Sequence, residues 1–282
     1  MFHRFKWTPV ANDRNRLLAE LEPVQPFYLL ALADAASCKT FLDIGANVGA
    51  YSLFASQLST VERCLAFEAN PTTARELRAN VQLNGASIDV MEAAVSDRAG
   101  QISFGVVSDF AGDNAVVDTA LRYSFSRQIS VRSMALDSLS GLPEPLCVKI
   151  DVEGHESKVI DGAKNFLRRP CVIQVEDFSN SIGSVLKPMG YFRLTAIGPD
   201  HYFSNIKALD GRAVEFYELA LAAMLVSIAE STYGPHQVTL RRGDFALEIS
   251  GKSAARLKKA KRLLGLTYGR DPNAHSSSAD PS

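Results

Sequence analysis

Short apolar runs alternate with amphipathic segments along the middle of the chain, from Thr40 to about Asn205. The runs are continuous and lack the alternation of a half-exposed strand, so they predict strands covered on both faces, as in a parallel sheet. The predicted strands are 41–44, 64–68, 88–95, 146–151 and 171–176, and the predicted helices between them are 48–58, 71–83, 155–167 and 181–189. This succession of strand and helix predicts a doubly wound α/β sheet.

Two other segments accompany this core, which we place at 39–205. Residues 1–38 carry apolar residues at helix-like spacing and predict an N-terminal helical segment. Residues 101–133 hold two strand-like runs, 102–107 and 129–131, around a polar stretch. We therefore expect a hairpin-like insertion inside the core.

The chain beyond the core has a different pattern, and we divide it into an extension over 206–269 and a tail over 270–282. The predicted elements of the extension are an apolar helix over 214–229, a hairpin with strands 238–240 and 245–249, and a basic helix over 253–264. The tail is rich in Ser, Pro and Asp, which predicts disorder.

Two helices of this extension are candidates for contact with a partner. The helix over 214–229 is apolar around most of its circumference, so we expect either the core or a second copy of the chain, in a homodimer, to bury it. The helix over 253–264 combines five basic residues with an apolar stripe. Its stripe would dock on the domain or, alternatively, the helix would lie peripherally on an anionic membrane surface.

Composition narrows the class of protein. A chain of 282 residues with 46% hydrophobic residues can bury a full core, and a net charge of −1 gives no general attraction to nucleic acid. The start of the sequence lacks the apolar segment of a signal peptide, and the longest apolar run, 219–226, is too short to cross a bilayer, so we expect a cytoplasmic protein. The four cysteines form no C-x-x-C pair, which favours reduced, structural thiols over a zinc site.

The strongest local motif is F-L-D-I-G-A-N-V-G over residues 41–49. An apolar strand leads through Asp43 into a loop with Gly45, Asn47 and Gly49, where the glycines allow a tight turn before a helix. The motif differs from the dinucleotide pattern G-x-G-x-x-G. A carboxylate before the first glycine would repel a pyrophosphate, whereas it would attract the sulfonium and ammonium groups of S-adenosylmethionine.

Two further carboxylates follow the next two predicted strands. Glu68 ends the second strand, where a carboxylate can accept both hydroxyls of a ribose, and Asp97 follows the third, which would put it beside the adenine. Each carboxylate alone would equally suit a helix cap or a solvated loop. Together with Asp43 they stand at the carboxyl ends of successive strands, where open α/β sheets bind ligands, so we expect S-adenosylmethionine as cofactor.

The predicted strand 146–151 ends in an unusual concentration of ionisable residues, with Asp151 followed by Glu153 and His155. Methyl transfer to a hydroxyl needs a positioned group to take the proton, and Asp151 and His155 are the candidates. His155 equally suits an exposed position on the following helix, and Lys149 suits a partner for a neighbouring carboxylate.

A second acidic pair, Glu176 and Asp177, ends the next strand. Asp151 with Glu176 or Asp177 could hold Mg²⁺ through oxygen ligands, and the ion would orient and acidify a substrate hydroxyl. Nothing in the sequence fixes the number of ligands, so the metal stays open.

These motifs together resemble the FkbM-type methyltransferase family. The resemblance is carried by D-I-G-A-N-V-G, A-F-E-A-N-P, A-V-S-D-R-A-G and K-I-D-V-E-G-H-E in this order, from about Thr40 to Glu176. It implies a class I methyltransferase fold with seven strands, the last antiparallel, and O-methylation of sugars, polyketides or other secondary metabolites. By motif match it implies cofactor contacts at Asp43, Gly45, Asn47, Gly49, Glu68 and Asp97, and an active site lined by Asp151, Glu153 and His155.

We therefore expect an S-adenosylmethionine-dependent O-methyltransferase that acts on a hydroxyl of a small glycan or secondary metabolite. Two other classes stay open. An NAD-dependent oxidoreductase or epimerase is disfavoured by the loop sequence and Asp43. A non-catalytic module that binds the cofactor or a glycan would keep the glycine loop but would not need the cluster around Asp151.

Overall fold

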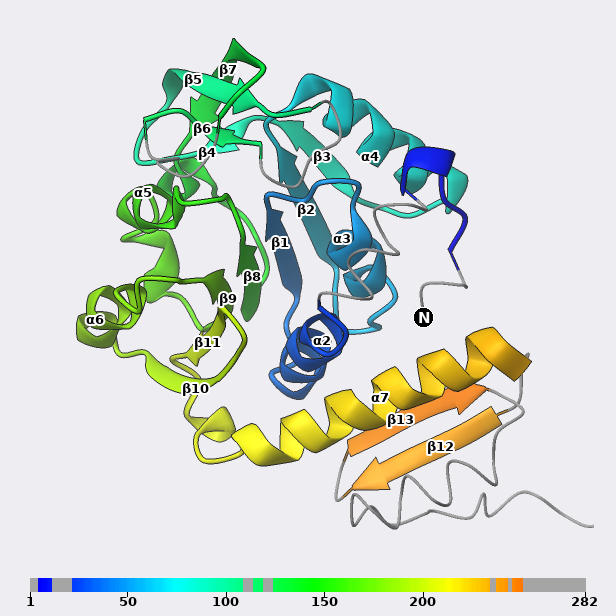
Figure 1. The fold of residues 1–282 in the computed structure, drawn as a ribbon. Helices are drawn as coiled ribbons and strands as arrows, with labels where there is room; N and C mark the ends of the chain where they lie inside the picture. Colours follow the sequence, from blue (N-terminus) through cyan, green and yellow to red (C-terminus); the bar gives the residue numbers. More distant parts are fainter. Residues whose placement is uncertain are drawn as a thin grey trace, which may run out of the picture. The chain divides into compact units, whose positions relative to one another are not determined.

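The computed structural model describes residues 5–11, 22–108, 114–118, 124–233, 237–242 and 245–250. The chain divides into two compact units, Met1–Ala220 and Leu221–Ser282, and the first contains the predicted core (Figure 1). Part of the expected N-terminal helical segment, the basic helix over 253–264 and the tail over 270–282 lie outside the described residues.

A seven-stranded sheet forms the centre of the first unit, in the order β10-β11-β9-β8-β1-β2-β3. The strands are β1 (Thr40–Ile44), β2 (Arg63–Glu68), β3 (Asp89–Glu92), β8 (Leu146–Ile150), β9 (Cys171–Glu176), β10 (Phe192–Ile197) and β11 (Asp200–Ser204). The first five of these pair in parallel, and β11, the last of the seven along the chain, runs antiparallel to both of its neighbours. The doubly wound class I fold expected from the sequence is thus confirmed.

Helices cover both faces of this sheet (Figure 1). One side carries α2 (Gln25–Ala35), α3 (Ala50–Ala55) and α4 (Pro71–Leu83), and the other carries α5 (Glu156–Asp161) and α6 (Ile182–Leu186). Short 3-10 helices follow at η2 (Leu136–Ser138), η3 (Phe166–Arg168), η4 (Lys187–Met189) and η5 (Lys207–Leu209). The strands are buried from both sides: Ile44 and Val148 pack with Val159 of α5, whereas Ala66 packs against Leu77 of α4.

Helix α4 has the bounds that the sequence predicts, because its start is marked locally. The side chain of Asn70 accepts a hydrogen bond from the backbone N–H of Thr72 (3.0 Å), and Pro71 occupies the first turn. The helix expected over 155–167 is shorter. Gly162 ends α5, and its backbone lies so close to Ser96 that an added Cβ would be 2.0 Å from the Ser96 carbonyl oxygen.

The apolar run over 88–95 is not one strand. It divides at Ala93: β3 of the main sheet ends before this residue, and β4 (Ala94–Val95) after it belongs to a second sheet in the order β4-β7-β5-β6. That sheet also contains β5 (Gly100–Val106), β6 (Ala115–Val116) and β7 (Arg127–Met134). The hairpin expected in the insertion is the antiparallel pair β5 and β7. Hydrophobicity alone does not reveal that a run changes its partner strand.

The apolar helix of the extension is α7 (Ala213–Tyr233). In its first turns Phe216, Leu219 and Ala220 are buried within the first unit, while 71% of Val214 is exposed, so the core covers one side of this part of the helix. Burial of the other side of this helix by a second copy of the chain stays a prediction. The expected hairpin forms from β12 (Gln237–Arg242) and β13 (Phe245–Ser250). Across the described part of the chain, no helix combines the length and hydrophobicity that crossing a membrane requires.

Candidate active site

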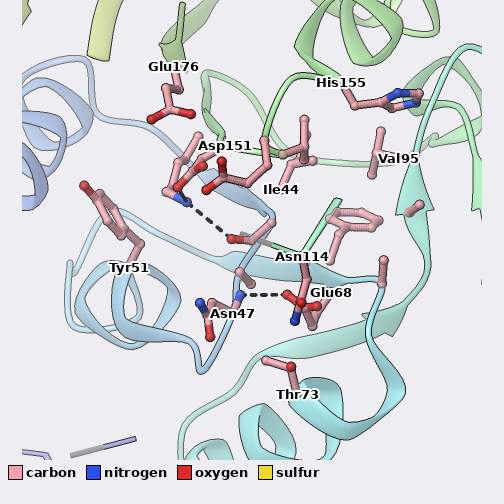
Figure 2. A pocket seen from close by; sticks show the side chains of 18 of the residues that line it. Ile44, Asn47, Tyr51, Glu68, Thr73, Val95, Asn114, Asp151, His155 and Glu176 are labelled. Atoms are coloured by element: carbon pink, nitrogen blue, oxygen red, sulfur yellow. Dashed lines mark hydrogen bonds and ion pairs between the residues drawn. The ribbon is translucent and has the colours of Figure 1, made fainter. Parts of the chain in front are cut away.

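A cavity of about 600 Å³ opens where β1, β2, β8 and β9 end at their carboxyl side. This is the edge at which open α/β sheets bind ligands. Figure 2 shows two ends of this cavity: Glu68, Asn47 and Asn114 lie at one, and Asp151, Glu176 and Tyr51 lie at the other. The residues that line the cavity include Glu22, Gly45, Asn47, Tyr51, Glu68, Asn114, Lys149, Asp151, Glu153, His155, Glu176 and Asp200.

The loop after β1 turns through three left-handed residues, Gly45 (φ 78°), Asn47 (φ 50°) and Gly49 (φ 91°). A Cβ added to Gly45 would lie 1.8 Å from the carbonyl oxygen of Asp151, and one added to Gly49 would lie 2.3 Å from Cδ1 of Leu77. The contact with the Asp151 backbone therefore requires glycine at 45, whereas at 49 it is the left-handed backbone that favours glycine. The motif predicted these glycines for a tight turn and for close approach to a ligand, but their contacts with Asp151 and Leu77 involve residues distant in the sequence.

Four backbone N–H groups of this loop already donate hydrogen bonds inside the protein. Those of Gly45 and Ala46 donate to the Phe67 carbonyl (3.0 and 2.9 Å), that of Asn47 to Oε2 of Glu68 (2.9 Å), and that of Gly49 to the Ala46 carbonyl (2.9 Å). A pyrophosphate is bound by such N–H groups when they are free. The loop thus disfavours a dinucleotide, and the many carboxylates around it suit a ligand with hydroxyl and cationic groups.

Asp43 lies beneath the loop and is not among the residues that line the cavity. Its Oδ2 accepts hydrogen bonds from the backbone N–H (3.0 Å) and the hydroxyl (2.6 Å) of Ser52 in α3, and its Oδ1 is 3.7 Å from Nζ of Lys149. Burial raises the pKa of Asp43, and the ammonium of Lys149 opposes that shift. In this position the carboxylate holds the first turn of α3 against the loop.

Glu68 lines the cavity at the end of β2, as expected. Backbone N–H groups of Asn47 and Asn70 donate to its two oxygens, both at 2.9 Å, and burial raises its pKa to about 7. Each oxygen keeps a second lone pair with which it could accept a ribose hydroxyl. Asp97, by contrast, pairs with Lys158 (3.3 Å) and does not line the cavity, so its predicted place beside the adenine gains no support from the geometry.

Asp151 stands directly after β8 and is held by Lys149. The ammonium donates to Oδ2 of Asp151 (3.0 Å) and to the Gly45 carbonyl (3.3 Å), in the partner role that the sequence predicts for Lys149. Only 4% of Lys149 is exposed. Burial alone would lower its pKa, but the carboxylates of Asp151 and Asp43 raise it above the ordinary value.

Three buried polar residues lie side by side across the sheet: Asp43 pairs in register with Lys149, and Lys149 with Gln174. Nε2 of Gln174 donates to Oδ1 of Asp200 (2.8 Å) and to the hydroxyl of Tyr51 (3.3 Å). The Tyr51 hydroxyl in turn donates to Oε2 of Glu22 (2.7 Å). Sequence reasoning missed Glu22, Tyr51 and Asp200. The polar residues inside apolar strands were the signal that could have pointed to this network.

His155 is buried, so its interpretation as an exposed helix residue is wrong. It is the N-cap residue of α5, lines the cavity, and has Nε2 2.9 Å from the hydroxyl of Ser96. Burial lowers its pKa, which leaves the imidazole neutral at pH 7. The neighbouring Glu153 also lines the cavity and has a left-handed backbone (φ 55°), a conformation that costs energy for a residue with a side chain.

The carboxylates proposed as magnesium ligands are only partly brought together. Oxygens of Asp151, Glu153 and Glu176 lie within 4.8 Å of one another, whereas Asp177 accepts hydrogen bonds from the backbone at the start of α6, including that of Ile182 (2.9 Å). Asp177 therefore holds the start of α6, and its predicted place as a magnesium ligand gains no support from the geometry. The ammonium of Lys149 already pairs with Asp151, so Mg²⁺ stays a hypothesis.

Comparison with known proteins agrees with this geometry. The sequence model of the FkbM methyltransferase domain matches residues 43–202. Hexuronic acid methyltransferase AglP of Haloferax volcanii is 29% identical over 162 residues, which are 56% of this chain and 64% of AglP. The chain thus matches somewhat less than two thirds of that curated relative.

Two solved methyltransferase structures are similar to this chain at lower identity. One from Geobacter sulfurreducens gives a TM-score of 0.42 at 11% identity, and an O-methyltransferase from Bacillus cereus in complex with SAH gives 0.41 at 14%. Each comparison covers 71% of this chain and 90% of the other. The strand order, and not these likenesses, carries the fold assignment.

Proposed function

Because the chain belongs to the FkbM methyltransferase family, and is an S-adenosylmethionine-dependent methyltransferase, we propose that it methylates a hydroxyl group of a glycan or of a small secondary metabolite. The observation that carries this proposal is one continuous cavity with Glu68 at one end and Asp151 and Glu176 at the other (Figure 2). A relative that is named for a hexuronic acid, which is a sugar, supports a glycan acceptor.

The end of the cavity at Glu68 suits the cofactor. Bound S-adenosylmethionine supplies an electron-poor methyl group on a sulfonium. For its part, the chain offers the two oxygens of Glu68 to ribose hydroxyls and presents the Gly45–Gly49 loop alongside them. Asn114, which reaches the same end from the insertion, adds an amide side chain to this wall (Figure 2).

The cavity offers two groups that could take the proton of the acceptor hydroxyl, Asp151 at the other end and His155 beside Ser96. Asp151 is fixed in position by Lys149, and a fixed carboxylate holds a hydroxyl in the geometry that reaction needs. His155 is neutral at pH 7 and is therefore able to accept a proton. We keep both as candidate bases.

Binding measurements test the cofactor. Titration calorimetry should show that S-adenosylhomocysteine binds and that NAD does not, because the loop N–H groups that would hold a pyrophosphate are already used. Binding of NAD instead would contradict the proposal and favour an oxidoreductase or epimerase.

Transfer of labelled methyl to glycan and metabolite extracts tests the chemistry. Mass spectrometry should find products that are heavier by one methylene and stable to mild alkali, as methyl ethers are and methyl esters are not. Loss of the base should lower turnover by about 10²–10⁴-fold with binding of S-adenosylhomocysteine retained, so Asp151→Asn and His155→Ala are the variants to compare. Wild-type turnover in both variants would exclude both candidate bases.

A further inference from the structure

The cavity end opposite Glu68 is crowded with carboxylates. We call it the acidic end, and it is formed by Glu22, Asp151, Glu153, Glu176 and Asp200. In Figure 2, Asp151 and Glu176 approach each other there, away from Glu68 and Asn47. Among the described residues that line the cavity, Lys149 alone carries a permanent positive charge.

Lys149 is not free to receive an anionic ligand. Its Nζ lies 3.0 Å from Asp151, 3.3 Å from the Gly45 carbonyl and 3.7 Å from Asp43, and it stands 5.0 Å from the centre of the Tyr51 ring. Turning toward a ligand carboxylate would leave two protein carboxylates without their cation. Removing one partner from a buried ion pair is strongly unfavourable.

The remaining carboxylates repel one another. Oxygens of Asp151, Glu153 and Glu176 lie within 4.8 Å of one another. Five carboxyl groups thus share one ammonium that is already paired, and a further anion would add to the repulsion among them.

We infer that the acceptor enters the acidic end through an uncharged or positively charged group, as a neutral or amino sugar would, and that acceptors with a carboxylate there are rejected. This inference rests on the proposed function and names its substrate class. It also separates this chain from the relative whose name specifies a hexuronic acid.

The first test identifies the methylated sugar or metabolite among the labelled products and determines the charge of the unit that carries the methyl group. A neutral or amine-bearing unit is expected, and a uronic acid would overturn the inference while leaving methyl transfer itself intact. Absence of any methylated product would instead count against the proposed function.

The second test compares methyl glycosides of glucose, 6-amino-6-deoxyglucose and glucuronic acid, which differ only at C6, at saturating S-adenosylmethionine. We expect kcat/KM, or affinity measured with S-adenosylhomocysteine bound, to be about 100-fold lower for the glucuronide than for the better of the other two, since like charges in contact are costly. A glucuronide used as well as the others would overturn the inference.

A matched pair of variants shows whether charge causes the discrimination against the glucuronide. Glu153→Gln should narrow the discrimination against the glucuronide by about tenfold, because it removes one of the carboxylates at the acidic end. Glu62→Gln should leave it unchanged, because Glu62 is exposed, pairs with Lys39 and immediately precedes β2 at the opposite edge of the sheet. Unchanged discrimination in Glu153→Gln, or failure of all three glycosides with both proteins, would overturn the inference.

Discussion

Lys149, which is itself almost fully buried, neutralises the buried carboxylate of Asp43 and the partly exposed carboxylate of Asp151. It lies 3.0 Å from Asp151 and 3.7 Å from Asp43, and Oδ1 of Asp43 has no hydrogen-bond partner among the residues that the structure describes. Lys149→Met keeps the length of the side chain but leaves both carboxylates without a positive charge beside them. We therefore expect it to lower the free energy of unfolding by about 3–5 kcal/mol in urea titrations.

The control for this variant is Lys39→Met. Lys39 pairs with Glu62 at 3.0 Å, but both side chains are exposed, so its loss should cost no more than about 1 kcal/mol. Equal stability of the two variants would show that the ammonium of Lys149 does not hold the carboxylates.

Glu68 links the binding of cofactor to pH. Its pKa is raised to about 7 by burial, so the carboxylate becomes ionised as the pH rises through that value. The ionised form accepts hydroxyl hydrogen bonds more strongly. We therefore predict that the affinity for S-adenosylhomocysteine, measured by calorimetry, increases between about pH 6 and pH 8.

Glu68→Gln provides the matched comparison, because an amide keeps the shape and loses the charge. It should weaken binding by about 1.5–3 kcal/mol at pH 8, which is the contribution expected of hydrogen bonds to a charged group. It should also abolish the increase with pH, and a variant that retains the increase would assign it to another residue.

At the scale of elements, the loop after β1 and the end of β8 touch through backbone atoms. A Cβ on Gly45 would meet the Asp151 carbonyl at 1.8 Å. Gly45→Ala should therefore cost more than about 4 kcal/mol or prevent folding, and also weaken binding of S-adenosylhomocysteine. Denaturant unfolding and calorimetry measure the two effects.

Gly85 separates this contact from the cost of the backbone conformation. It also has a left-handed backbone (φ 58°), yet an added Cβ would meet nothing within 4 Å. Gly85→Ala should then cost only about 1–2 kcal/mol, which is the penalty of the conformation itself. Similar losses for the two glycines would contradict a tight contact at Gly45.

The sequence allowed prediction of those elements whose limits are set by neighbouring residues. Asn70 and Pro71 mark the start of α4, and its bounds were predicted correctly. The division of 88–95 at Ala93 was not, because it depends on β7, a strand that lies more than 30 residues later and pairs with β4. Likewise, Glu68 and Asp151 could be predicted because they stand at strand ends. Glu22 could not, because its place at the site depends on a hydrogen bond from Tyr51, which lies 29 residues later in the chain.

For the whole molecule, buried carboxyl groups make stability depend on pH. Burial raises the pKa of Glu176 to about 9, so the folded state binds a proton there that the unfolded state has already released at pH 7. This carboxyl group stabilises the folded protein at pH values below its pKa in the unfolded chain. That contribution is lost as the pH rises through its pKa in the folded protein. The ligand-free protein should therefore unfold at a lower temperature at pH 9 than at pH 7.

Scanning calorimetry of the wild type and Glu176→Gln checks the direction in which the unfolding temperature changes with pH. The variant cannot titrate at this position, so its unfolding temperature should fall less over the same interval. Some decrease should persist, because burial raises the pKa of Cys64, Cys147 and Cys171 and their thiols act in the same direction. A wild-type unfolding temperature that rises from pH 7 to pH 9 would refute the assignment.

The Asp151 carbonyl that fills the space above Gly45 also bears on how such an enzyme could diversify. Since main-chain atoms set the spacing between the two loops, exchanges of side chains at Glu22, Glu176 or Asp200 leave it intact. Substitutions on β9 and β11 could then change the acceptor during evolution without altering the end of the cavity that would bind the cofactor.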